Sequence, residues 1–454
     1  MRARMMDIDR RRLLAGSAAA GTVSAAAINP ATGATPSFAL GIDATHLGVL
    51  PGNPDDQSRV FQRAIERAAN ARVPLLLPPG TYRASDLVLP SHAQIVGVRG
   101  STRIELSDSV SLLRASGADN IGLFGLVLDG GDNPLRKGRG LVHLSQGQGL
   151  HIAECEIINS GGDGIVLEQI AGRVSASHIA KVAGSAIFSR DARGLVISTN
   201  KVRDAGNNGI LVWRSIAGED GTRVIDNHIE NIAARAGGSG QNGNAINVFR
   251  ASNVIVRGNS IRGTAFSAVR GNAASNLLIL DNNCTDLGEV ALYAEFGFEG
   301  AVIANNIVDG AAIGVAVTNF NEGGRLGVVQ GNLLRNLVRS RIDDGHGIGI
   351  GVEADTAVTG NVIENAPSVG IAVGYGKYLR DVAVTGNIVR SAGIGIGVSV
   401  TPGAGAALIA NNLIAGAIQG AIVGSDGNKR VTGDLTKVGA ERYAHLSIGP
   451  NSVN

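Results

Sequence analysis

The chain has 454 residues, and its composition excludes several classes of protein before any motif is considered. Apolar residues make up 44% and charged residues only 17%, so the chain can bury a large core and is not intrinsically disordered. Its 65 glycines follow no Gly-X-Y period and prolines number only 12, which excludes a collagen-like helix. The net charge of +2 predicts no strongly polyanionic partner such as nucleic acid.

Residues 1–39 are predicted to be a targeting segment outside the fold. Arg10, Arg11 and Arg12 precede a weakly apolar run, rich in alanine and glycine, over residues 15–28. This run is too short and too weakly apolar for a stable membrane span, and the arginine pair makes the segment resemble a twin-arginine signal peptide. Small residues permit cleavage after Ala27, Ala34 or Ala39. We therefore expect export of the folded protein to the periplasm or beyond, with Arg10 and Arg11 binding the twin-arginine export machinery.

Removal of this segment also changes the charge of the protein. Residues 1–39 contain five arginines and two aspartates, so the net charge falls from +2 to −1. A mature chain without positive charge further disfavours nucleic-acid binding.

An N-terminal cap is predicted over about residues 42–100. Asn53 and Pro54 suit the N-cap and first position of a helix. Apolar residues then recur with helical spacing at Val60, Phe61, Ala64, Ile65 and Ala68. Such an amphipathic helix would cover the open end of a stack of repeats.

The body of the chain, coils over about residues 100–425, repeats a unit of about 26 residues. From residue 155 the unit can be aligned on a recurring position, occupied in turn by Cys155, Ser177, Asn200, Asn227, Asn259, Asn283, Asn306, Asn332, Asn361, Asn387 and Asn412. Short β-branched segments alternate with Gly and Asn turns without a helical period, which predicts three short strands and three turns per unit. Stacked units would form parallel strands ~4.8 Å apart, with asparagine amides bonding along the stack. The predicted fold is an all-β, single-stranded parallel β-helix over residues 40–454, with a C-terminal tail over 426–454.

The motifs of the cap carry a resemblance to known proteins. In order they are Asp55-Asp56, Phe61-Gln62, Ala64-Ile65, Leu77-Pro78-Pro79-Gly80-Thr81-Tyr82 and Ile95-Val96-Gly97-Val98. This order resembles the cap of pectate-lyase-like right-handed parallel β-helix proteins. With the arginine pair and the Gly-Asn repeats, the whole chain resembles the twin-arginine-exported β-helix repeat proteins. The resemblance, over about residues 42–425, implies a right-handed β-helix with a capping α-helix. The wider superfamily, which includes polyuronate lyases, galacturonan hydrolases and alginate epimerases, implies work on carbohydrate.

The cysteines and histidines predict neither a disulfide nor a metal site. Cys155 and Cys284 lie five coils apart, or ~24 Å, too far for a disulfide, so both should be free and buried. His178 and His228 share a column but lie two coils apart, ~10 Å, too far to hold one zinc ion. The sequence contains no cofactor-binding motif, and no cofactor is expected.

One outer strand of each coil carries the candidate site. Ile165 and Leu167 are predicted to point inward, so Val166 and Glu168 point outward. The equivalent outward pairs of the next coils are Phe188/Arg190, Leu211/Trp213, Asn247/Phe249, Arg270/Asn272, Tyr293/Glu295 and Ala316/Thr318. Polar groups beside aromatic rings suit a sugar chain, whose rings stack and whose hydroxyls need hydrogen-bond partners. We therefore predict a polysaccharide site, with a merely solvated outer face as the alternative.

Within this site the residues are expected to play different roles. Trp213, Asn247, Phe249 and Asn272 would bind the polysaccharide. For a lyase or epimerase, Arg270 would neutralise a uronate carboxylate, Tyr293 would act as base or acid, and Glu295 would orient Arg270. The same Arg-Tyr-Glu set could equally be a structural ion pair.

Two insertions, residues 233–243 and 339–345, precede the same outer strand and are expected to flank this centre. The second contains Asp343 and Asp344, next to His346, which suggests a glycoside hydrolase as an alternative. Glu295 and this aspartate pair would lie two coils apart, ~10 Å, close to the ~6.5–9.5 Å between the carboxylates of inverting glycosidases.

The last coils carry glycine at positions assigned to the outer face, Gly349, Gly351, Gly374 and Gly397. Because glycine allows another backbone to approach closely, either the C-terminal tail or a second subunit is predicted to cover them. Two classes of function remain open: an enzyme that processes a polysaccharide, as a lyase or epimerase or alternatively as a hydrolase, and a non-catalytic glycan-binding or cell-envelope structural protein.

Overall fold

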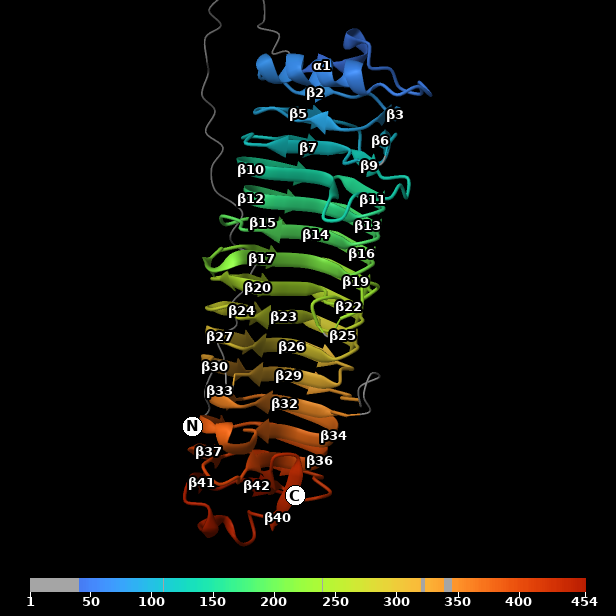
Figure 1. The fold of residues 1–454 in the computed structure, drawn as a ribbon. Helices are drawn as coiled ribbons and strands as arrows, with labels where there is room; N and C mark the ends of the chain where they lie inside the picture. Colours follow the sequence, from blue (N-terminus) through green and yellow to red (C-terminus); the bar gives the residue numbers. More distant parts are fainter. Residues whose placement is uncertain (1–40, 109, 239, 320–322, 339–344) are drawn as a thin grey trace, which may run out of the picture. The chain divides into compact units, whose positions relative to one another are not determined.

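The computed structural model describes residues 41–454 except 109, 239, 320–322 and 339–344. The predicted signal segment therefore lies outside the described residues, and the chain divides into units of residues 1–39 and 40–454. The second unit is a parallel β-solenoid of 42 strands in which each coil stacks on the one before it (Figure 1). The predicted all-β parallel β-helix with an N-terminal capping helix is confirmed.

Each coil contributes strands to three parallel sheets. Sheet 1 contains β4 (Leu87–Val88), β7 (Leu113–Ser116), β10 (Gly140–Ala153), β12 (Asp163–Ser175), β14 (Ser185–Arg190), β17 (Asn208–Glu219), β20 (Ile246–Ser252), β23 (Val269–Asn272), β26 (Val290–Glu295), β29 (Ile313–Thr318), β32 (Ile348–Val352), β34 (Val362–Val373), β36 (Ile388–Ser399) and β39 (Ile422–Asp426). Strands β10 and β12 turn a corner into sheet 2, and β34 and β36 arrive from sheet 3.

Sheets 2 and 3 close the coil behind sheet 1. Sheet 2 adds β1 (Ile42–Asp43), β2 (Leu75–Leu76), β5 (Gln94–Val96), β8 (Gly122–Phe124), β15 (Val196–Ser198), β18 (Arg223–Ile225), β21 (Ile255–Arg257), β24 (Leu277–Leu280), β27 (Glu299–Ala304), β30 (Arg325–Gln330), β33 (Ala354–Thr359), β35 (Arg380–Thr385), β37 (Ala407–Ala410) and β41 (Leu446–Ile448). Sheet 3 adds β3 (Gly80–Ala84), β6 (Thr102–Leu106), β9 (Val127–Asp129), β11 (Glu156–Ser160), β13 (His178–Val182), β16 (Lys201–Ala205), β19 (His228–Ile232), β22 (Ser260–Thr264), β25 (Asn283–Leu287), β28 (Ile307–Asp309), β31 (Leu333–Arg335), β38 (Leu413–Ala415) and β42 (Ser452–Val453).

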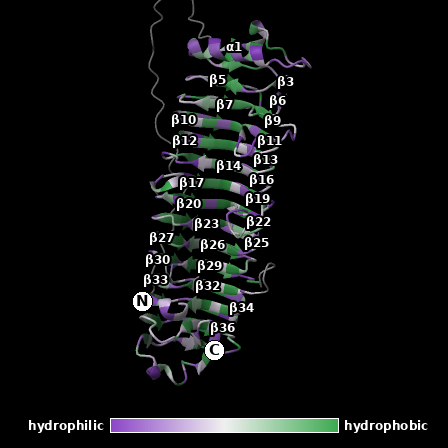
Figure 2. Ribbon diagram, in the orientation of Figure 1, coloured by the Kyte–Doolittle hydropathy of each residue, from purple (hydrophilic) through white to green (hydrophobic). Residues whose placement is uncertain are grey.

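Small aliphatic side chains fill the space inside the coils. Ile165, Ile187 and Ile210 stack in one inward column of sheet 1, and all three are fully buried. Each aliphatic side chain buried in this way contributes ~1.5–3 kcal/mol to stability. Apolar residues accordingly dominate the middle of the strands (Figure 2). The interior therefore makes sheet 1 a rigid support for its outward side chains.

The capping helix begins later than the sequence suggested. Helix α1 runs over Ser58–Asn70, with Gln57 at the N-cap, so the prediction of Asn53 and Pro54 for the first positions was wrong. The Asn53 side chain instead accepts from the backbone N–H of Asp55. Gln57 is buried and bonds both the N–H and the carbonyl of Leu50, which holds the preceding segment in a turn. The predicted apolar stripe of α1 does face the coils.

The asparagine column forms a continuous ladder inside one turn of each coil. From Asn227 onward each Oδ1 accepts from the backbone N–H and the Nδ2 of the asparagine one coil before, as Asn227 does from Asn200 at 3.0 Å. The ladder continues through Asn412 to Asn451, and all rungs from Asn200 to Asn412 are buried. One predicted rung was wrong: Asn282 occupies the ladder, and Asn283 is exposed on β25.

Asn282→Ala is expected to lower the free energy of unfolding by about 2–4 kcal/mol. The substitution leaves both the backbone N–H and the amide of Asn259 without their buried acceptor. Asn283→Ala is the matched control and should stay within about 0.5 kcal/mol of the parent, because that side chain is exposed. Urea unfolding followed by circular dichroism measures both, and equal losses would contradict the ladder.

The two cysteines and the histidine column agree with expectation. Cys155 and Cys284 are free and buried, and burial raises their thiol pKa values to about 11 and about 12. Lys201 stands between His178 and His228 in one column of sheet 3, which places the histidines two coils apart.

The C-terminal region differs from its prediction. Strand β40 (Lys429–Asp434) folds back antiparallel on β39, whereas β41 and β42 continue sheets 2 and 3. The coils thus continue past residue 425 almost to the C-terminus.

One of the glycine assignments in the last coils also needs correction. Gly351, not Gly349, pairs with Ala316, and a Cβ at Gly349 would lie 2.6 Å from buried Ile363, so Gly349 points inward. A Cβ at Gly351 would meet no described atom within 4 Å, and one at Gly397 would meet only Val369. The tail therefore does not cover these two positions, while cover by a second subunit remains a prediction.

Candidate functional site

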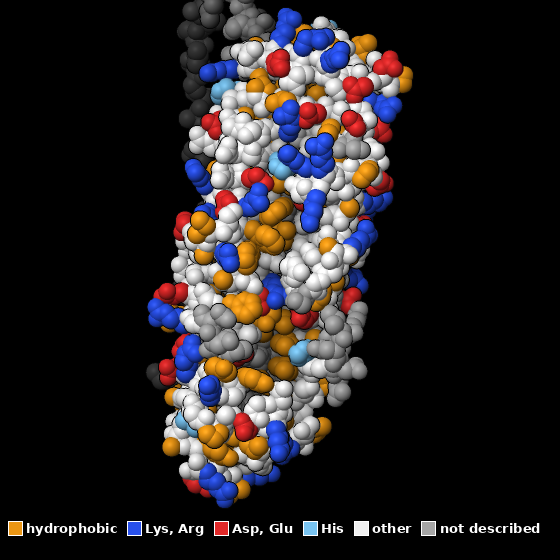
Figure 3. All heavy atoms as spheres, in the orientation of Figure 1, with side chains coloured by type: hydrophobic (Ala, Val, Ile, Leu, Met, Phe, Trp, Pro, Cys, Tyr) orange, Lys and Arg blue, Asp and Glu red, His pale blue; other side chains and the backbone are white. Residues whose placement is uncertain are grey.

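The outward side chains of sheet 1 between β7 and β29 form one continuous surface, here called the outer face. The strand register confirms the predicted alignment: one column reads Val166, Phe188, Leu211, Asn247, Arg270, Tyr293 and Ala316, and the other reads Glu168, Arg190, Trp213, Phe249, Asn272, Glu295 and Thr318. Hydrophobic side chains gather near the middle of this surface, with arginines and a histidine closer to α1 (Figure 3).

Three aromatic rings on successive coils form the apolar centre of the outer face. The ring centroids of Phe188 and Trp213 lie 5.3 Å apart, and those of Trp213 and Phe249 lie 5.4 Å apart. The guanidinium of Arg250 lies 4.7 Å from the centroid of Phe249. All three rings are half-buried, so part of each remains open to a ligand. Phe188 was only an outward position in the sequence, and the structure adds it to Trp213 and Phe249.

The predicted reactive residues meet on the next two coils. Arg270 donates from Nε to Glu295 Oε1 at 2.6 Å and from Nη2 to Oε2 at 2.9 Å. Asn272 donates to the same carboxylate at 2.8 Å, and the guanidinium lies 5.1 Å from the centroid of the Tyr293 ring. Adjacent coils in register therefore bring all four residues together, as expected.

The side chains of this cluster are more buried than their outward positions on the strands would suggest. The side chains of Arg270 and Glu295 are only 12% and 2% exposed, and Asn247 in the adjoining position is also buried. The first insertion explains part of this burial, because a Cβ at Gly240 would lie 1.5 Å from Arg270 Nη1. The insertion thus flanks Arg270 as predicted, and its backbone covers the guanidinium.

The electrostatics of the cluster restrict what each group can do. Burial alone would lower the pKa of Arg270, but the hydrogen bonds and the charge of Glu295 outweigh it and raise that pKa. Arg270 therefore stays a cation. Burial raises the pKa of Tyr293 to about 12, against a smaller opposing effect of a hydrogen bond with Thr318. At neutral pH Tyr293 is therefore a phenol, which can donate a proton but is not a ready base.

The residues of the hydrolase alternative are only partly described. Asp343 and Asp344 lie outside the described residues, so their distance from Glu295 remains a prediction. His346 lies two residues before β32, is partly buried, and its carbonyl accepts from the Ser368 hydroxyl. His346 thus lies at the start of a sheet 1 strand, as expected from the position of the second insertion before that strand.

Toward α1 the outer face continues into residues that the sequence reasoning missed. Val88, Arg114 and His143 precede Val166 in its column. His143 is buried, its Nε2 lies 4.0 Å from Glu168 Oε1, and Glu168 also pairs with Arg190. Burial and the charge of Arg139 lower the pKa of His143. The repeat can be aligned in the sequence only from Cys155 onward, so the outward positions of these earlier coils were not identified.

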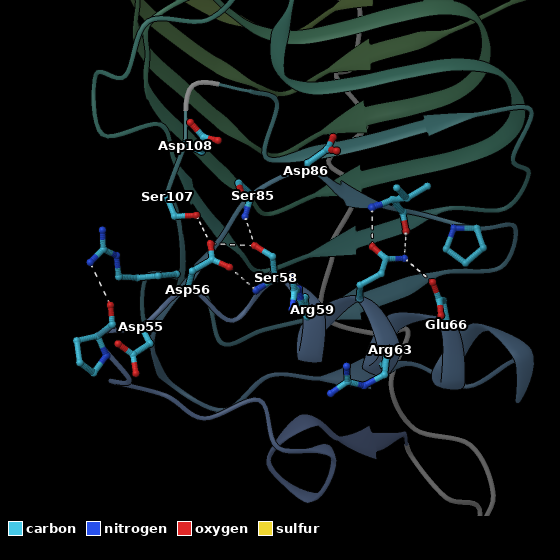
Figure 4. A pocket seen from close by; sticks show the side chains of 15 residues that line it. Asp55, Asp56, Ser58, Arg59, Arg63, Glu66, Ser85, Asp86, Ser107 and Asp108 are labelled. Atoms are coloured by element: carbon cyan, nitrogen blue, oxygen red, sulfur yellow. Dashed lines mark hydrogen bonds between the residues drawn. The ribbon is translucent and has the colours of Figure 1, made fainter.

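At its end beneath α1 the outer face opens into a groove of about 1190 Å³ (Figure 4). The Asp56 carboxylate there accepts from the hydroxyls of Ser58 and Ser107 and from the backbone N–H of Ser58. Gln62 of α1 bonds the backbone of Val88 in both directions. These contacts attach the helix to the first coils, so the groove belongs to the cap.

No helix among the described residues is long and apolar enough to cross a membrane. Nor do they contain three or more His, Cys, Asp or Glu side chains grouped so that they could hold a metal ion.

Comparison with known proteins identifies the fold. A family model described as a right-handed β-helix region matches residues 131–217, 163–332 and 215–378. The catalytic unit of a GH87 α-1,3-glucanase from Streptomyces thermodiastaticus strain HF3-3 is 16% identical with a TM-score of 0.47, and the match covers 94% of this chain and 70% of that one. The A-module of the mannuronan C-5 epimerase AlgE6 from Azotobacter vinelandii is 18% identical with a TM-score of 0.43, covering 91% and 99%.

PfbA, a surface adhesin of Streptococcus pneumoniae, is 14% identical with a TM-score of 0.45, covering 86% of this chain and 94% of that one. At these identities the likeness concerns the fold alone. No curated protein matches the chain in sequence.

Proposed function

The chain belongs to the right-handed β-helix family, and on that basis we propose that it binds a polysaccharide along the outer face of sheet 1. The proposal rests on one observation: the half-buried ring cluster of Phe188, Trp213 and Phe249 lies beside polar side chains on successive, rigidly spaced coils. Sugar rings stack on aromatic faces while their hydroxyls bond to nearby polar groups. A flat, repeating surface of this kind suits an extended polymer.

Processing of the polymer by a lyase or epimerase reaction is the finer form of this proposal. One observation favours it: Tyr293, with its pKa raised to about 12, lies against the Arg270 cation. A protonated phenol could supply the acid for a departing oxygen, and Glu295 would hold Arg270 in place. Because Arg270 already pairs with Glu295, however, the geometry supports binding more directly than neutralisation of a uronate carboxylate.

Export to the periplasm or cell surface completes the proposal. It is supported by the sequence of residues 1–39, where Arg10 and Arg11 precede a short apolar run. A non-catalytic role in the cell envelope fits the same surface, and a hydrolase would depend on Asp343 and Asp344.

The test is a screen of the protein against polyuronates and neutral glycans. Binding is read by calorimetry, elimination by the ultraviolet absorbance of the unsaturated product, and hydrolysis by new reducing ends. Binding of at least one glycan is expected, and elimination that disappears in Tyr293→Phe would add the lyase reaction. Reducing ends without elimination would indicate a hydrolase, and the absence of all three signals would reject the proposed function.

A further inference from the structure

A second pocket opens at the α1 end of the outer face. It has a volume of about 290 Å³ and is lined by Asp86, Val110, Ser111, Arg114, Arg136 and Arg139. Arg114 lies on β7, and Arg136 and Arg139 lie on the segment between β9 and β10. We call it the arginine pocket. It holds three guanidinium groups and one carboxylate, an excess of positive charge in a protein whose net charge is near zero.

The single carboxylate of the pocket does not balance the charge. Asp86 is already bound by Arg114, with Nη2 3.2 Å from Oδ2. Arg136 and Arg139 are exposed, and within the described part of the chain neither forms an ion pair. Two guanidinium groups therefore face the pocket with their donors available to a ligand.

The pocket is continuous with the proposed glycan surface. Arg114 and Phe188 stand in the same column of sheet 1, three coils apart, or ~14 Å at ~4.8 Å per coil. Between them lies His143, whose Nδ1 is buried and has no hydrogen-bond partner among the described residues. The segment that carries Arg136 and Arg139 enters sheet 1 on the same edge as the 233–243 insertion beside Arg270. A polymer stacked on the rings and running toward α1 would thus reach the pocket.

We propose that the arginine pocket binds an anionic group, a carboxylate or a sulfate, of the polysaccharide that lies on the outer face. Guanidinium groups bind both anions in a planar, bidentate manner, which gives geometric selection as well as charge attraction. This inference rests on the proposed function and adds to it that the polymer is acidic.

The test compares one double variant with a control in the same segment. Arg136→Gln/Arg139→Gln removes two charges from the pocket, and Lys137→Gln removes one exposed charge that does not line it. Calorimetric titrations use an oligouronate, a sulfated oligosaccharide and a neutral oligosaccharide. The double variant should bind the preferred acidic oligosaccharide ~10-fold or more weakly, whereas Lys137→Gln should change affinity less than 2-fold.

The outcomes separate this inference from the proposed function. If binding of the oligouronate depends on Arg136 and Arg139, the anionic group is a carboxylate. If binding of the sulfated oligosaccharide depends on them, the group is a sulfate. Unchanged affinity in the double variant, an equal loss in Lys137→Gln, or an equal loss for the neutral oligosaccharide would overturn the arginine pocket while glycan binding stands. If the unaltered protein binds none of the three oligosaccharides, the pocket proposal falls together with glycan binding.

Discussion

Glu295→Gln should lower the free energy of unfolding by about 3–5 kcal/mol, because it removes the hydrogen-bonded counter-charge of the buried Arg270 cation and leaves only the looser contact with Glu289, at 4.0 Å. The pair is bidentate, with 2.6 and 2.9 Å between donors and acceptors, and the Glu295 side chain is only 2% exposed. Arg270 cannot turn easily to solvent, since the backbone of Gly240 lies against its Nη1. Denaturant unfolding of the variant measures the loss.

The matched control is Glu299→Gln on β27, the next strand of the same coil. Glu299 pairs with Arg325, but both side chains are more than half exposed, at 60% and 54%. Exposed pairs contribute ~0–1 kcal/mol, so this variant should be nearly neutral. Removing both buried charges, in Arg270→Met/Glu295→Leu, should recover much of the loss. Similar losses for Glu295→Gln and Glu299→Gln would show that Arg270 reaches water.

Trp213→Ala should weaken glycan binding ~10-fold or more, because it removes the central ring of the cluster. Trp213 contacts Phe188 on one coil and Phe249 on another, so its loss interrupts the stacking surface rather than shortening it. Trp213→Phe keeps an aromatic face at this position and should restore most of the affinity. Calorimetry with the glycan identified in the screen gives the dissociation constants.

Phe124→Ala provides the control for that experiment. Phe124 is also half-buried and packs against an aromatic neighbour, His151, with ring centroids 5.0 Å apart, but it lies on sheet 2. Its removal should leave glycan affinity unchanged. Equal weakening by Phe124→Ala would indicate a general loss of structure, and unchanged binding by Trp213→Ala would remove the ring cluster from the site.

Local sequence patterns were sufficient where one physical constraint repeats on every coil. Inward positions must be aliphatic to fill a narrow interior, and each ladder asparagine must form hydrogen bonds with the asparagine of the adjacent coil. Both features therefore recur along the chain. Where the repeat is interrupted, the same reasoning assigned residues to the wrong positions of the coil. Asn282 and Asn283 are both plausible rungs, and only stacking on Asn259 and Asn306 distinguishes them. The insertion before β32 likewise shifted the predicted alignment by two residues, so that Gly349 was assigned to the position that Gly351 occupies opposite Ala316.

The sequence by itself determined the parallel β-helix, its capping helix, and the register that places Arg270, Asn272, Tyr293 and Glu295 on adjacent coils. Tertiary structure alone decided how open those residues are. Burial depends on what the insertions cover, as Gly240 covers Arg270, and no alternation along a strand contains that information. The arginine pocket also appears only in three dimensions, because Asp86, Arg114 and Arg139 come from different coils. Side chains distant along the chain meet there because stacking brings each coil within ~4.8 Å of the next.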